Sequence, residues 1–358
     1  MHIITGLDKA GAESILYKLI ESDTIYNHSV LSLTGDGYYG NKFNAMGIET
    51  FYIDFRKREK IFKNIINIMD IINNEHPDIV QTWMYHSDLI GGILSKICGV
   101  KKIIWSIHNI ELDSKILSII RYLSAMLSHI IPTSIVSVSR EGKRFHIVIG
   151  YAKRKFSTIN NGIDIEKFSI TSKHKTKDIK IANIARFDLI KDHSNLIKGI
   201  SLVADDINKQ VKYLFIGENI NNDNKYLTNI LSKYKLIKFV DLLGVRDNIH
   251  QLLKKVDIFI LSSKSEAQPL VLMEAMASGV PCISTDVGDC KNIIGDTGWL
   301  IKKENSKQLS KAIETAILER NTQPQKWNRR RKKCRKRIET YFNQKNMVAK
   351  YQHLWSRV

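Results

Sequence analysis

Short apolar runs alternate with segments of helical periodicity along most of this 358-residue chain. The alternation is typical of βαβ units, in which helices join parallel strands and cover the sheet. In the first half, the strands are expected at residues 2–5, 29–33, 51–53, 79–82, 103–107, 135–138 and 157–159. Helices are expected between them, among others at residues 12–21, 61–73, 87–98 and 116–127.

The pattern stops once and then restarts. Residues 160–164 form a turn cluster, and a basic polar stretch at 172–180 is interpreted as a linker. Further strands are expected at residues 180–185, 212–216, 237–242, 258–261 and 282–285. We therefore predict an α/β protein with two Rossmann-like, doubly wound domains, residues 1–165 and 166–340. Ligands bind at the carboxyl ends of parallel strands, so we expect the chemistry in a central cleft that both domains face.

The charge of the chain predicts an anionic partner. Fifty-five Lys and Arg against 36 Asp and Glu give a formal charge of +19, and residues 326–337 alone hold nine basic side chains. Nucleic acid, anionic lipid and phosphorylated substrates would all be attracted, whereas an exposed, solubilising helix face would need no partner.

The remaining composition suggests a cytoplasmic protein. The four cysteines (Cys98, Cys282, Cys290, Cys334) have no metal-ligand spacing, and scattered thiols without an export signal favour a reducing compartment. The most apolar window, residues 116–138, is interrupted by polar side chains, so no membrane-spanning segment is expected.

The most informative motif follows the expected strand at residues 258–261. Residues 262–279 read SSKSEAQPLVLMEAMASG, in which Pro269 is suited to the first turn of a helix and Gly279 to its C-terminus. Two carboxylates result, Glu266 on the loop and Glu274 within the helix.

The start of that helix predicts a phosphate site. The amides of its first turn, around Pro269, Leu270 and Val271, would present the positive end of the helix dipole to a diphosphate. A carboxylate such as Glu274 is suited to binding two ribose hydroxyls.

This stretch resembles the Glu-x7-Glu motif of retaining glycosyltransferases with the GT-B fold, most closely glycosyltransferase family 4. The similarity continues through residues 280–288. The resemblance implies that Glu266 lies near the donor sugar and that Glu274 binds the nucleotide ribose. It also implies that residues 341–358 form a C-terminal helix that crosses back onto the first domain.

A second match opens the C-terminal domain. Residues 184–193 read IARFDLIKDH and resemble the Arg-x4-Lys loop of the family, with Arg186 and Lys191 in its two basic positions. A strand-end Arg and a nearby Lys can neutralise the charge on a departing nucleoside diphosphate, and we expect no metal ion. Gly217 also fits the pattern, as a small residue that lets the backbone approach the nucleotide.

The N-terminal domain carries weaker matches. Residues 6–13 (GLDKAGAE) resemble the Gly-Gly-Ala-Glu loop of the family, with Ala10 in place of the first glycine and Gly11 free to approach donor or acceptor. His108 ends an expected strand and resembles the histidine that contacts the donor sugar. Residues 83–86 (WMYH) follow another expected strand, and Trp83, Tyr85 and His86 are candidates for lining the acceptor pocket.

These observations predict a retaining glycosyltransferase. It would move a hexose or N-acetylhexosamine from a nucleoside diphosphate sugar, with UDP favoured over GDP, to a polyprenyl-diphosphate-linked glycan in O-antigen or capsule assembly. No cofactor is expected. A nucleotide-sugar epimerase on the same fold is the nearer alternative. A basic nucleic-acid-binding protein is the more remote one, because no nucleic-acid module is recognisable.

The basic charge also suggests a location. Lys143, Arg144 and residues 153–155 surround an apolar stretch, residues 145–151, and such a combination suits peripheral docking on anionic lipid. Together with the run at residues 326–337, it predicts an enzyme on the inner face of the cytoplasmic membrane.

Overall fold

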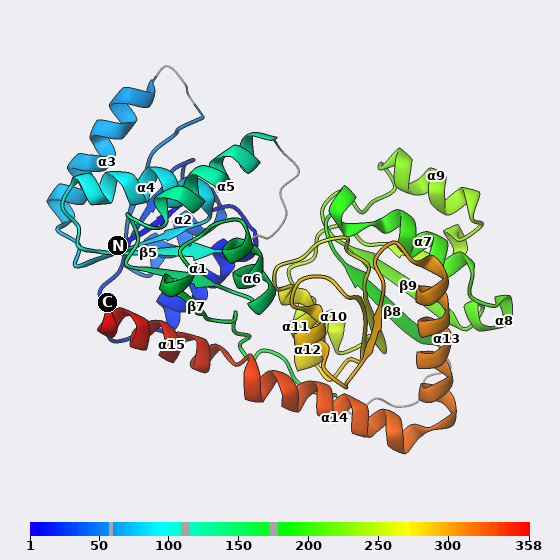
Figure 1. Ribbon diagram of the computed structural model, residues 1–358. Helices are drawn as coiled ribbons and strands as arrows, with labels where there is room; N and C mark the ends of the chain where they lie inside the picture. Colours follow the sequence, from blue (N-terminus) through cyan, green and yellow to red (C-terminus); the bar gives the residue numbers. More distant parts are fainter. Residues whose placement is uncertain (57–59, 109–114, 172–177) are drawn as a thin grey trace. The chain divides into compact units, whose positions relative to one another are not determined.

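The computed structural model describes residues 1–56, 60–108, 115–171 and 178–358. The chain divides into two compact units (Figure 1). Unit 1 comprises Met1–Gly162 and Gln344–Val358, and unit 2 comprises Ile163–Asn343. Most of the expected linker, residues 172–177, lies outside the described residues.

Unit 1 contains a seven-stranded parallel sheet with the order β3-β2-β1-β4-β5-β6-β7. The strands are β1 (His2–Ile4), β2 (Ser29–Ser32), β3 (Glu49–Tyr52), β4 (Ile79–Trp83), β5 (Lys102–Ile107), β6 (Ser134–Ser137) and β7 (Phe156–Thr158). Its helices are α1 (Gly11–Ser22), α2 (Gly37–Ala45), α3 (Ile61–Glu75), α4 (Tyr85–Ile97), α5 (Lys115–Leu127), α6 (Arg140–Val148) and α15 (Gln344–Arg357). The order reverses beside β1, which is the doubly wound arrangement expected from the sequence.

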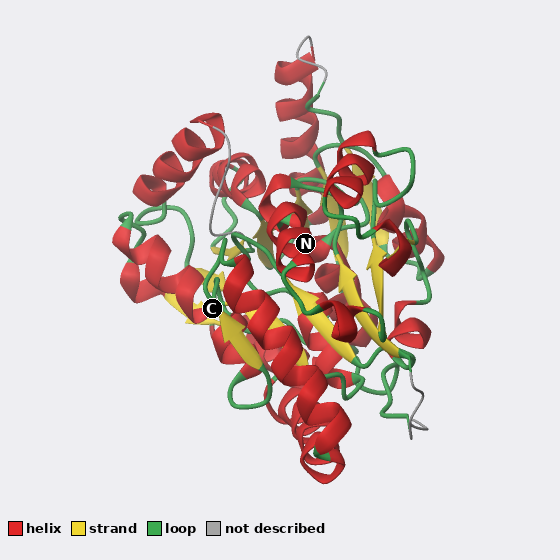
Figure 2. Cartoon of the chain, turned by 90° about the vertical axis from the view of Figure 1, so that its right-hand side faces the viewer, coloured by secondary structure: helices red, strands yellow, loops and turns green. Residues whose placement is uncertain are grey.

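Unit 2 repeats this design in a six-stranded parallel sheet with the order β10-β9-β8-β11-β12-β13. Its strands are β8 (Ile179–Ile184), β9 (Val211–Ile216), β10 (Val240–Leu242), β11 (Ile258–Leu261), β12 (Cys282–Thr285) and β13 (Trp299–Ile301). Its helices are α7 (His193–Ser201), α8 (Asp205–Asn208), α9 (Lys225–Lys233), α10 (Ile249–Leu253), α11 (Leu270–Ala277), α12 (Cys290–Ile294), α13 (Ser306–Thr322) and α14 (Pro324–Tyr341). Figure 2 shows helices flanking the strands.

Two sequence expectations for unit 2 need correction. The strand expected at residues 237–242 is only half as long, because Ile237–Phe239 form a 3-10 turn before β10 begins. The edge strand β13 was not expected, since three residues are too few to show a period.

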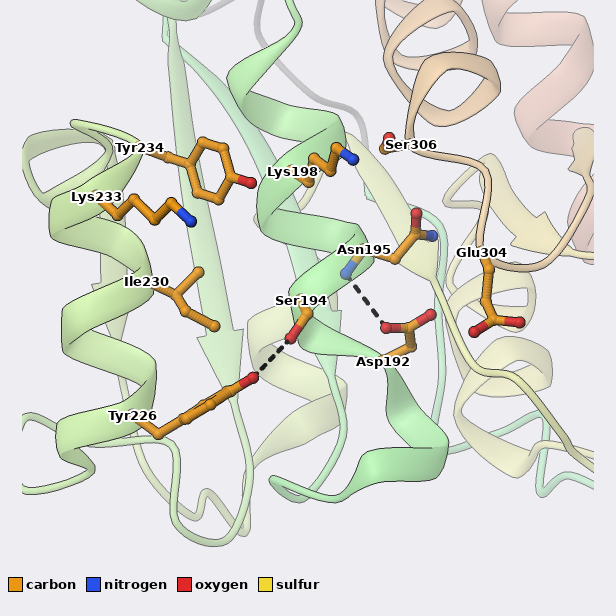
Figure 3. Close-up of a pocket in the computed structure, with 10 residues that line it drawn as sticks. All are labelled: Asp192, Ser194, Asn195, Lys198, Tyr226, Ile230, Lys233, Tyr234, Glu304 and Ser306. Carbon is orange, nitrogen blue, oxygen red and sulfur yellow. Dashed lines mark hydrogen bonds between the residues drawn. The ribbon is translucent and has the colours of Figure 1, made fainter.

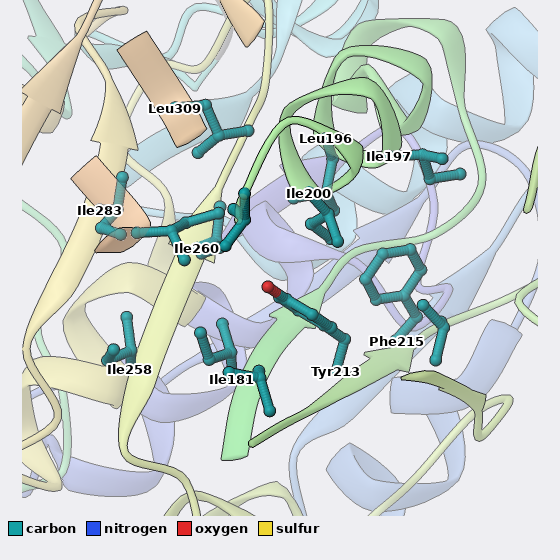
Figure 4. Close-up of a cluster of buried hydrophobic side chains, with 14 of the residues drawn as sticks. Ile181, Leu196, Ile197, Ile200, Tyr213, Phe215, Ile258, Ile260, Ile283 and Leu309 are labelled. Atoms are coloured by element: carbon teal, nitrogen blue, oxygen red, sulfur yellow. The ribbon is translucent and has the colours of Figure 1, made fainter. Parts of the chain in front are cut away.

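Both faces of the unit 2 sheet are covered by apolar side chains. Ile181, Tyr213 and Ile260 pack on one face with residues of α7 and α13 (Figure 4). Ala182 and Phe259, their neighbours along the strands, point to the other face and pack with α11, α12 and α14. Strands buried on both faces explain why their sequences read as continuous apolar runs rather than alternating ones.

The last helix, α15, packs against the rest of unit 1 through polar contacts. Gln352 Nε2 donates to Asp23 Oδ1 at 2.7 Å, and Trp355 Nε1 donates to Gln81 Oε1 at 2.7 Å. Gln344 Nε2 also donates to Ser22 Oγ at 2.7 Å. Because buried polar groups are costly without partners, these bonds fix how the helix lies on this unit.

The basic run at residues 326–337 has a structural role that the sequence did not suggest. It lies on α14, where Arg331 is 7% exposed and donates to the carbonyls of Gly279, at 3.2 Å, and Thr171, at 2.8 Å. Arg335 donates to Ala277 O at 2.9 Å, and Arg337 to Ile293 O at 2.7 Å. These guanidinium groups satisfy carbonyls at the C-terminal ends of α11 and α12, where helices lack internal donors.

Other charges of the run are paired. Arg330 donates from Nε and Nη2 to the two carboxylate oxygens of Glu319, at 2.7 and 2.8 Å, and Lys333 pairs with Asp296 at 3.1 Å. The run therefore offers fewer free charges to an anionic partner than the sequence suggests, because several of its side chains are engaged inside unit 2.

Replacing Arg331 with Met is expected to destabilise the protein by about 2 kcal/mol, because buried carbonyls lose charged donors while the apolar stem is kept. Urea unfolding measures the change. Arg329→Met, at an exposed position of the same helix, is the control and is expected to leave stability unchanged. Equal effects of the two substitutions would contradict a capping role for Arg331.

Candidate functional site

Two neighbouring strands of unit 2 bring the predicted residues together. β8 and β11 pair in parallel, so the loops after Ile184 and Leu261 leave the same edge of the sheet. Lys191 Nζ lies 2.6 Å from Glu266 Oε1, and both side chains are largely buried. Ser263 Oγ donates to the same carboxylate oxygen at 2.7 Å. The structure thus brings together two residues that are 75 positions apart in the sequence.

The backbone around Glu266 is held by its neighbours. Lys264 N donates to Ile190 O at 2.7 Å, and Ser262 Oγ to Lys191 O at 2.9 Å. Gly288 has φ +51°, and a Cβ there would lie 1.8 Å from Glu266 O. Only glycine fits at that point, so the loop that carries the carboxylate is positioned from two sides.

Arg186 is held by a carboxylate of its own loop. Its Nε and one terminal nitrogen each lie 3.0 Å from Asp188 Oδ2, and Ile190 N donates to Asp188 Oδ1 at 2.9 Å. Burial alone would raise the pKa of Asp188, but the hydrogen bonds from Ile190 and Arg186 lower it below its usual value. The ionised carboxylate directs a guanidinium that is still 56% exposed and accessible to a ligand.

Arg186 and Lys191 therefore each have a carboxylate partner in this structure. A diphosphate arriving at the loop would compete with Asp188 and Glu266 for the two cations. Phosphate groups, which carry up to two negative charges, compete well with carboxylates for guanidinium and ammonium groups. The two cations can bind an anion, and the two carboxylates can neutralise them again when the anion leaves.

Gly217 is required for a reason internal to the fold. It has φ +150°, and a Cβ would lie 2.1 Å from the carbonyl oxygen of Ala185. Its N–H donates to Gly244 O at 2.9 Å. The glycine thus allows the chain after β9 to lie directly against the chain after β8, close to Arg186.

The second carboxylate lies on α11. This helix begins at Leu270, immediately after Pro269, and ends before Gly279, which has φ +67° as expected for a helix terminus. Glu274, Leu270 and Val271 are half-buried.

In unit 1, His108 directly follows β5. Burial lowers its pKa to about 3, so its imidazole is neutral near pH 7. The ring lies 5.1 Å from that of Trp83, and among the described residues Nε2 has no hydrogen-bond partner. A neutral imidazole with a free nitrogen can accept from or donate to a hydroxyl group. Gly11, the first residue of α1, is exposed, and a Cβ there would meet no atom within 4 Å.

Two candidates for the acceptor pocket are wrong. Trp83 is fully buried and donates to His2 Nδ1 at 3.2 Å. Tyr85 is 3% exposed, and its hydroxyl lies 2.6 Å from His146 Nε2. Both rings pack in the interior of unit 1, where large aromatic side chains fill the space beside the sheet. His86 is half-buried.

A pocket of about 320 Å³ lies elsewhere on unit 2 (Figure 3). It lies between α7 and α9 and is lined by residues such as Asn195, Lys198 and Tyr226. None of the predicted site residues lines it. Asp192, which directly follows Lys191 in the chain, is among its lining residues. Among residues 1–56, 60–108, 115–171 and 178–358, no group of three or more His, Cys, Asp or Glu could hold a metal ion.

Glu13 is a residue that the sequence did not single out. It lies in the first turn of α1, two residues after Gly11, and is 7% exposed. Burial raises the pKa of Glu13 to about 7, and the nearby charge of Asp8 adds to this shift. Only the position of the glutamate in the motif at residues 6–13 could have drawn attention to it, since burial is not visible in a sequence.

The raised pKa of Glu13 predicts a pH-dependent stability. The folded state holds the proton more tightly than the unfolded state, so this contribution is present below about pH 4.5 and is lost as the pH rises through 7. The Glu13→Gln variant cannot ionise at this position. Its free energy of unfolding, relative to that of the wild type, is therefore expected to be about 2–3 kcal/mol higher at pH 8 than at pH 5. Urea unfolding of both proteins at pH 5 and at pH 8 tests this difference. Glu49→Gln, at an exposed position, is the control, and an equal gain there would contradict the role of burial.

The comparisons with known proteins agree on one family. Residues 7–167 match the model of Glycosyltransferase Family 4, and residues 164–337 match that of Glycosyl transferases group 1. A galactosyltransferase of Escherichia coli, UDP-Gal:alpha-D-GlcNAc-diphosphoundecaprenol alpha-1,3-galactosyltransferase, is 25% identical over 83% of this chain and 79% of its own. The capsular polysaccharide biosynthesis glycosyltransferase CapH of Staphylococcus aureus is 25% identical over 80% of this chain and 81% of its own.

A solved structure shows the same fold. Anabaena HepE, crystallised with UDP and glucose, superposes with a TM-score of 0.86 at 18% identity, covering 100% of this chain and 99% of the other. The two doubly wound units and this likeness confirm the predicted GT-B fold. With its two family models together spanning residues 7–337, the chain belongs to glycosyltransferase family 4 and is a glycosyltransferase.

Proposed function

We propose that this glycosyltransferase moves a hexose or N-acetylhexosamine from a UDP-sugar to a polyprenyl-diphosphate-linked glycan, with retention of configuration. The observation that carries the proposal is the cluster of Arg186, Lys191 and Glu266 at the carboxyl edge of the unit 2 sheet. The Escherichia coli relative is named for a UDP-sugar donor and a diphosphoundecaprenol acceptor, and HepE was crystallised with UDP. Both support the donor, and the first supports the acceptor.

Each residue of the cluster has a role in the proposed reaction. The bond between the anomeric carbon and the diphosphate breaks, and negative charge grows on the leaving oxygen. Arg186 and Lys191 stabilise that charge, which is the part of the barrier that fixed cations lower most. Glu266 lies near the donor sugar, Glu274 binds the ribose hydroxyls, and the first turn of α11, at Leu270 and Val271, holds the phosphates. No metal or other cofactor is needed for these steps.

Retention follows from attack on the same face that the leaving group departs from. The acceptor oxygen bonds to the anomeric carbon, and its proton passes to an oxygen of the leaving diphosphate. His108, neutral near pH 7, is suited to hydrogen-bonding a sugar hydroxyl. Gly11 leaves room for close approach of backbone to ligand, whereas Gly217 acts indirectly by letting the chain after β9 lie against the chain that carries Arg186.

The proposed acceptor places the enzyme at the cytoplasmic face of the membrane, in O-antigen or capsule assembly. Within the described residues, no helix combines the length and the hydropathy that crossing a bilayer requires. The proposal therefore includes peripheral attachment, and it includes no nucleic-acid partner.

Binding of the nucleotide tests the donor. We expect calorimetric titration without added metal to show binding of UDP, and weaker or no binding of GDP, ADP and CMP. Glu274→Ala is expected to weaken UDP binding at least tenfold, because two hydroxyl contacts are lost. Glu314→Ala, at another half-buried glutamate of unit 2, is the control. Binding that survives Glu274→Ala would contradict the ribose role.

Product analysis tests the chemistry. From an α-linked UDP-sugar we expect an α-linked product by NMR, and Lys191→Met is expected to lower kcat by about 10²–10³ with the same anomer formed. Lys198→Met, at an exposed lysine in the last turn of α7, is the control and is expected to leave kcat unchanged. A β-linked product would contradict retention, and an unchanged kcat for Lys191→Met would remove the lysine from the reaction.

A further inference from the structure

One helix of unit 1 carries a row of exposed apolar side chains. On α5, Ile119 is 61% exposed, Tyr122 55%, Leu123 47% and Met126 72%. Their spacing of three and four residues places them on one face of the helix. Ile130, in the turn that follows, is 71% exposed. Exposed apolar residues scattered singly need no explanation, but a row along one helix face does.

The opposite side of α5 is already used by the fold. Ala125 is 3% exposed and packs in the core of unit 1, with Ile120 and Leu127 against it. Ser124 is fully buried and donates from Oγ to Ile120 O at 2.9 Å. In Figure 1, α5 runs beside α4 in the layer of helices outside the sheet. The exposed row is therefore a second apolar face, one that packing within unit 1 does not explain.

The surroundings of this face are strongly basic. Residues 114–163 contain eight Lys and Arg and a single acidic residue, Glu141. Contacts place this basic segment next to α5: the Arg121 guanidinium lies 5.1 Å from the ring of Phe145, and His129 Nε2 donates to Gly150 O at 3.0 Å. Lys155 Nζ donates to His129 O at 2.8 Å. Lys153 and Arg154, beside it, are exposed.

We propose that the outer face of α5, with Ile130, docks on the surface of an anionic lipid bilayer. An apolar helix face with basic residues around it gains from burial among acyl chains and from attraction to anionic headgroups at once. The inference deepens the proposed function and rests on it, because a lipid-linked acceptor requires the enzyme at the membrane.

This surface differs from the one expected from the sequence. In the apolar stretch at residues 145–151, His146 and Tyr151 are buried, and Val148, at 84%, is the only apolar side chain that is exposed rather than half-buried. The run on α14 is largely engaged within unit 2. The chain enters α5 from the strand end that carries His108, so the docking face and a predicted site residue belong to the same unit.

Co-sedimentation with lipid vesicles tests the proposal. The full chain is expected to bind vesicles of phosphatidylglycerol and phosphatidylcholine, and the triple variant Ile119→Ser, Met126→Ser, Ile130→Ser to partition at least tenfold less. The control is Leu202→Ser, Ile237→Ser, Leu318→Ser, which removes three exposed apolar side chains from unit 2. It is expected to bind like the wild type. Lys153→Ala with Arg154→Ala is expected to weaken binding to anionic vesicles, most clearly at low salt.

The outcomes separate this inference from the proposed function. Calorimetric binding of UDP is expected to be unchanged in the triple variant, which also shows that it is folded. Undiminished vesicle binding by that variant would overturn the docking face. So would a wild-type dimer in sedimentation velocity that the triple variant loses, since a second copy would then cover α5. Vesicle binding without any UDP binding would instead overturn the proposed donor and leave the docking face standing.

Discussion

The parallel pairing of β8 with β11 is the interaction on which the candidate site depends. It places two loops at one edge of a sheet, and the 2.6 Å contact between Lys191 and Glu266 follows from it. Two strands that are adjacent in space need not be adjacent in the chain, and here β9 and β10 come between them in sequence. The apolar layers on both faces of this sheet fix the pairing, because a shift of one residue would turn buried side chains toward the wrong face.

Each of the two cations in the candidate site has a carboxylate partner. Asp188 and Glu266 neutralise Arg186 and Lys191, which would otherwise repel one another across a partly buried loop. An anionic ligand would have to replace these carboxylates. Its net binding energy would therefore be the difference between the ion pairs that it forms with the two cations and the ion pairs that it breaks. In the proposed reaction, such a site would release the nucleoside diphosphate product more easily than a pair of unopposed cations would.

Much of this was predictable from the sequence, and the failures have physical causes. Parallel strands buried on both faces give long apolar runs, so most strands and the order of the two units could be predicted. The site motifs could be found because Arg186, Lys191, Glu266 and Glu274 follow strand ends with a recognisable spacing. A three-residue edge strand such as β13 leaves no such trace.

Charge and aromatic content were less informative. A basic run looks the same whether its side chains reach solvent or, like Arg331, buried carbonyls of the same unit. Trp83 looked like a ligand contact, although it packs in the core. The exposed apolar face of α5 could not be predicted from the sequence, because apolar residues on a helix are ordinarily assigned to the interior.

The way unit 1 is assembled from two distant pieces has a consequence for biosynthesis. Its sheet lies within residues 1–162, but α15, which supplies bonding partners to Asp23 and Gln81, is translated only after the whole of unit 2. While the nascent chain is growing, the polar groups that α15 will engage and the apolar side chains beside them remain uncovered. Unit 1 therefore reaches its final form after synthesis of unit 2, and its incomplete surface is one that a ribosome-bound chaperone would meet.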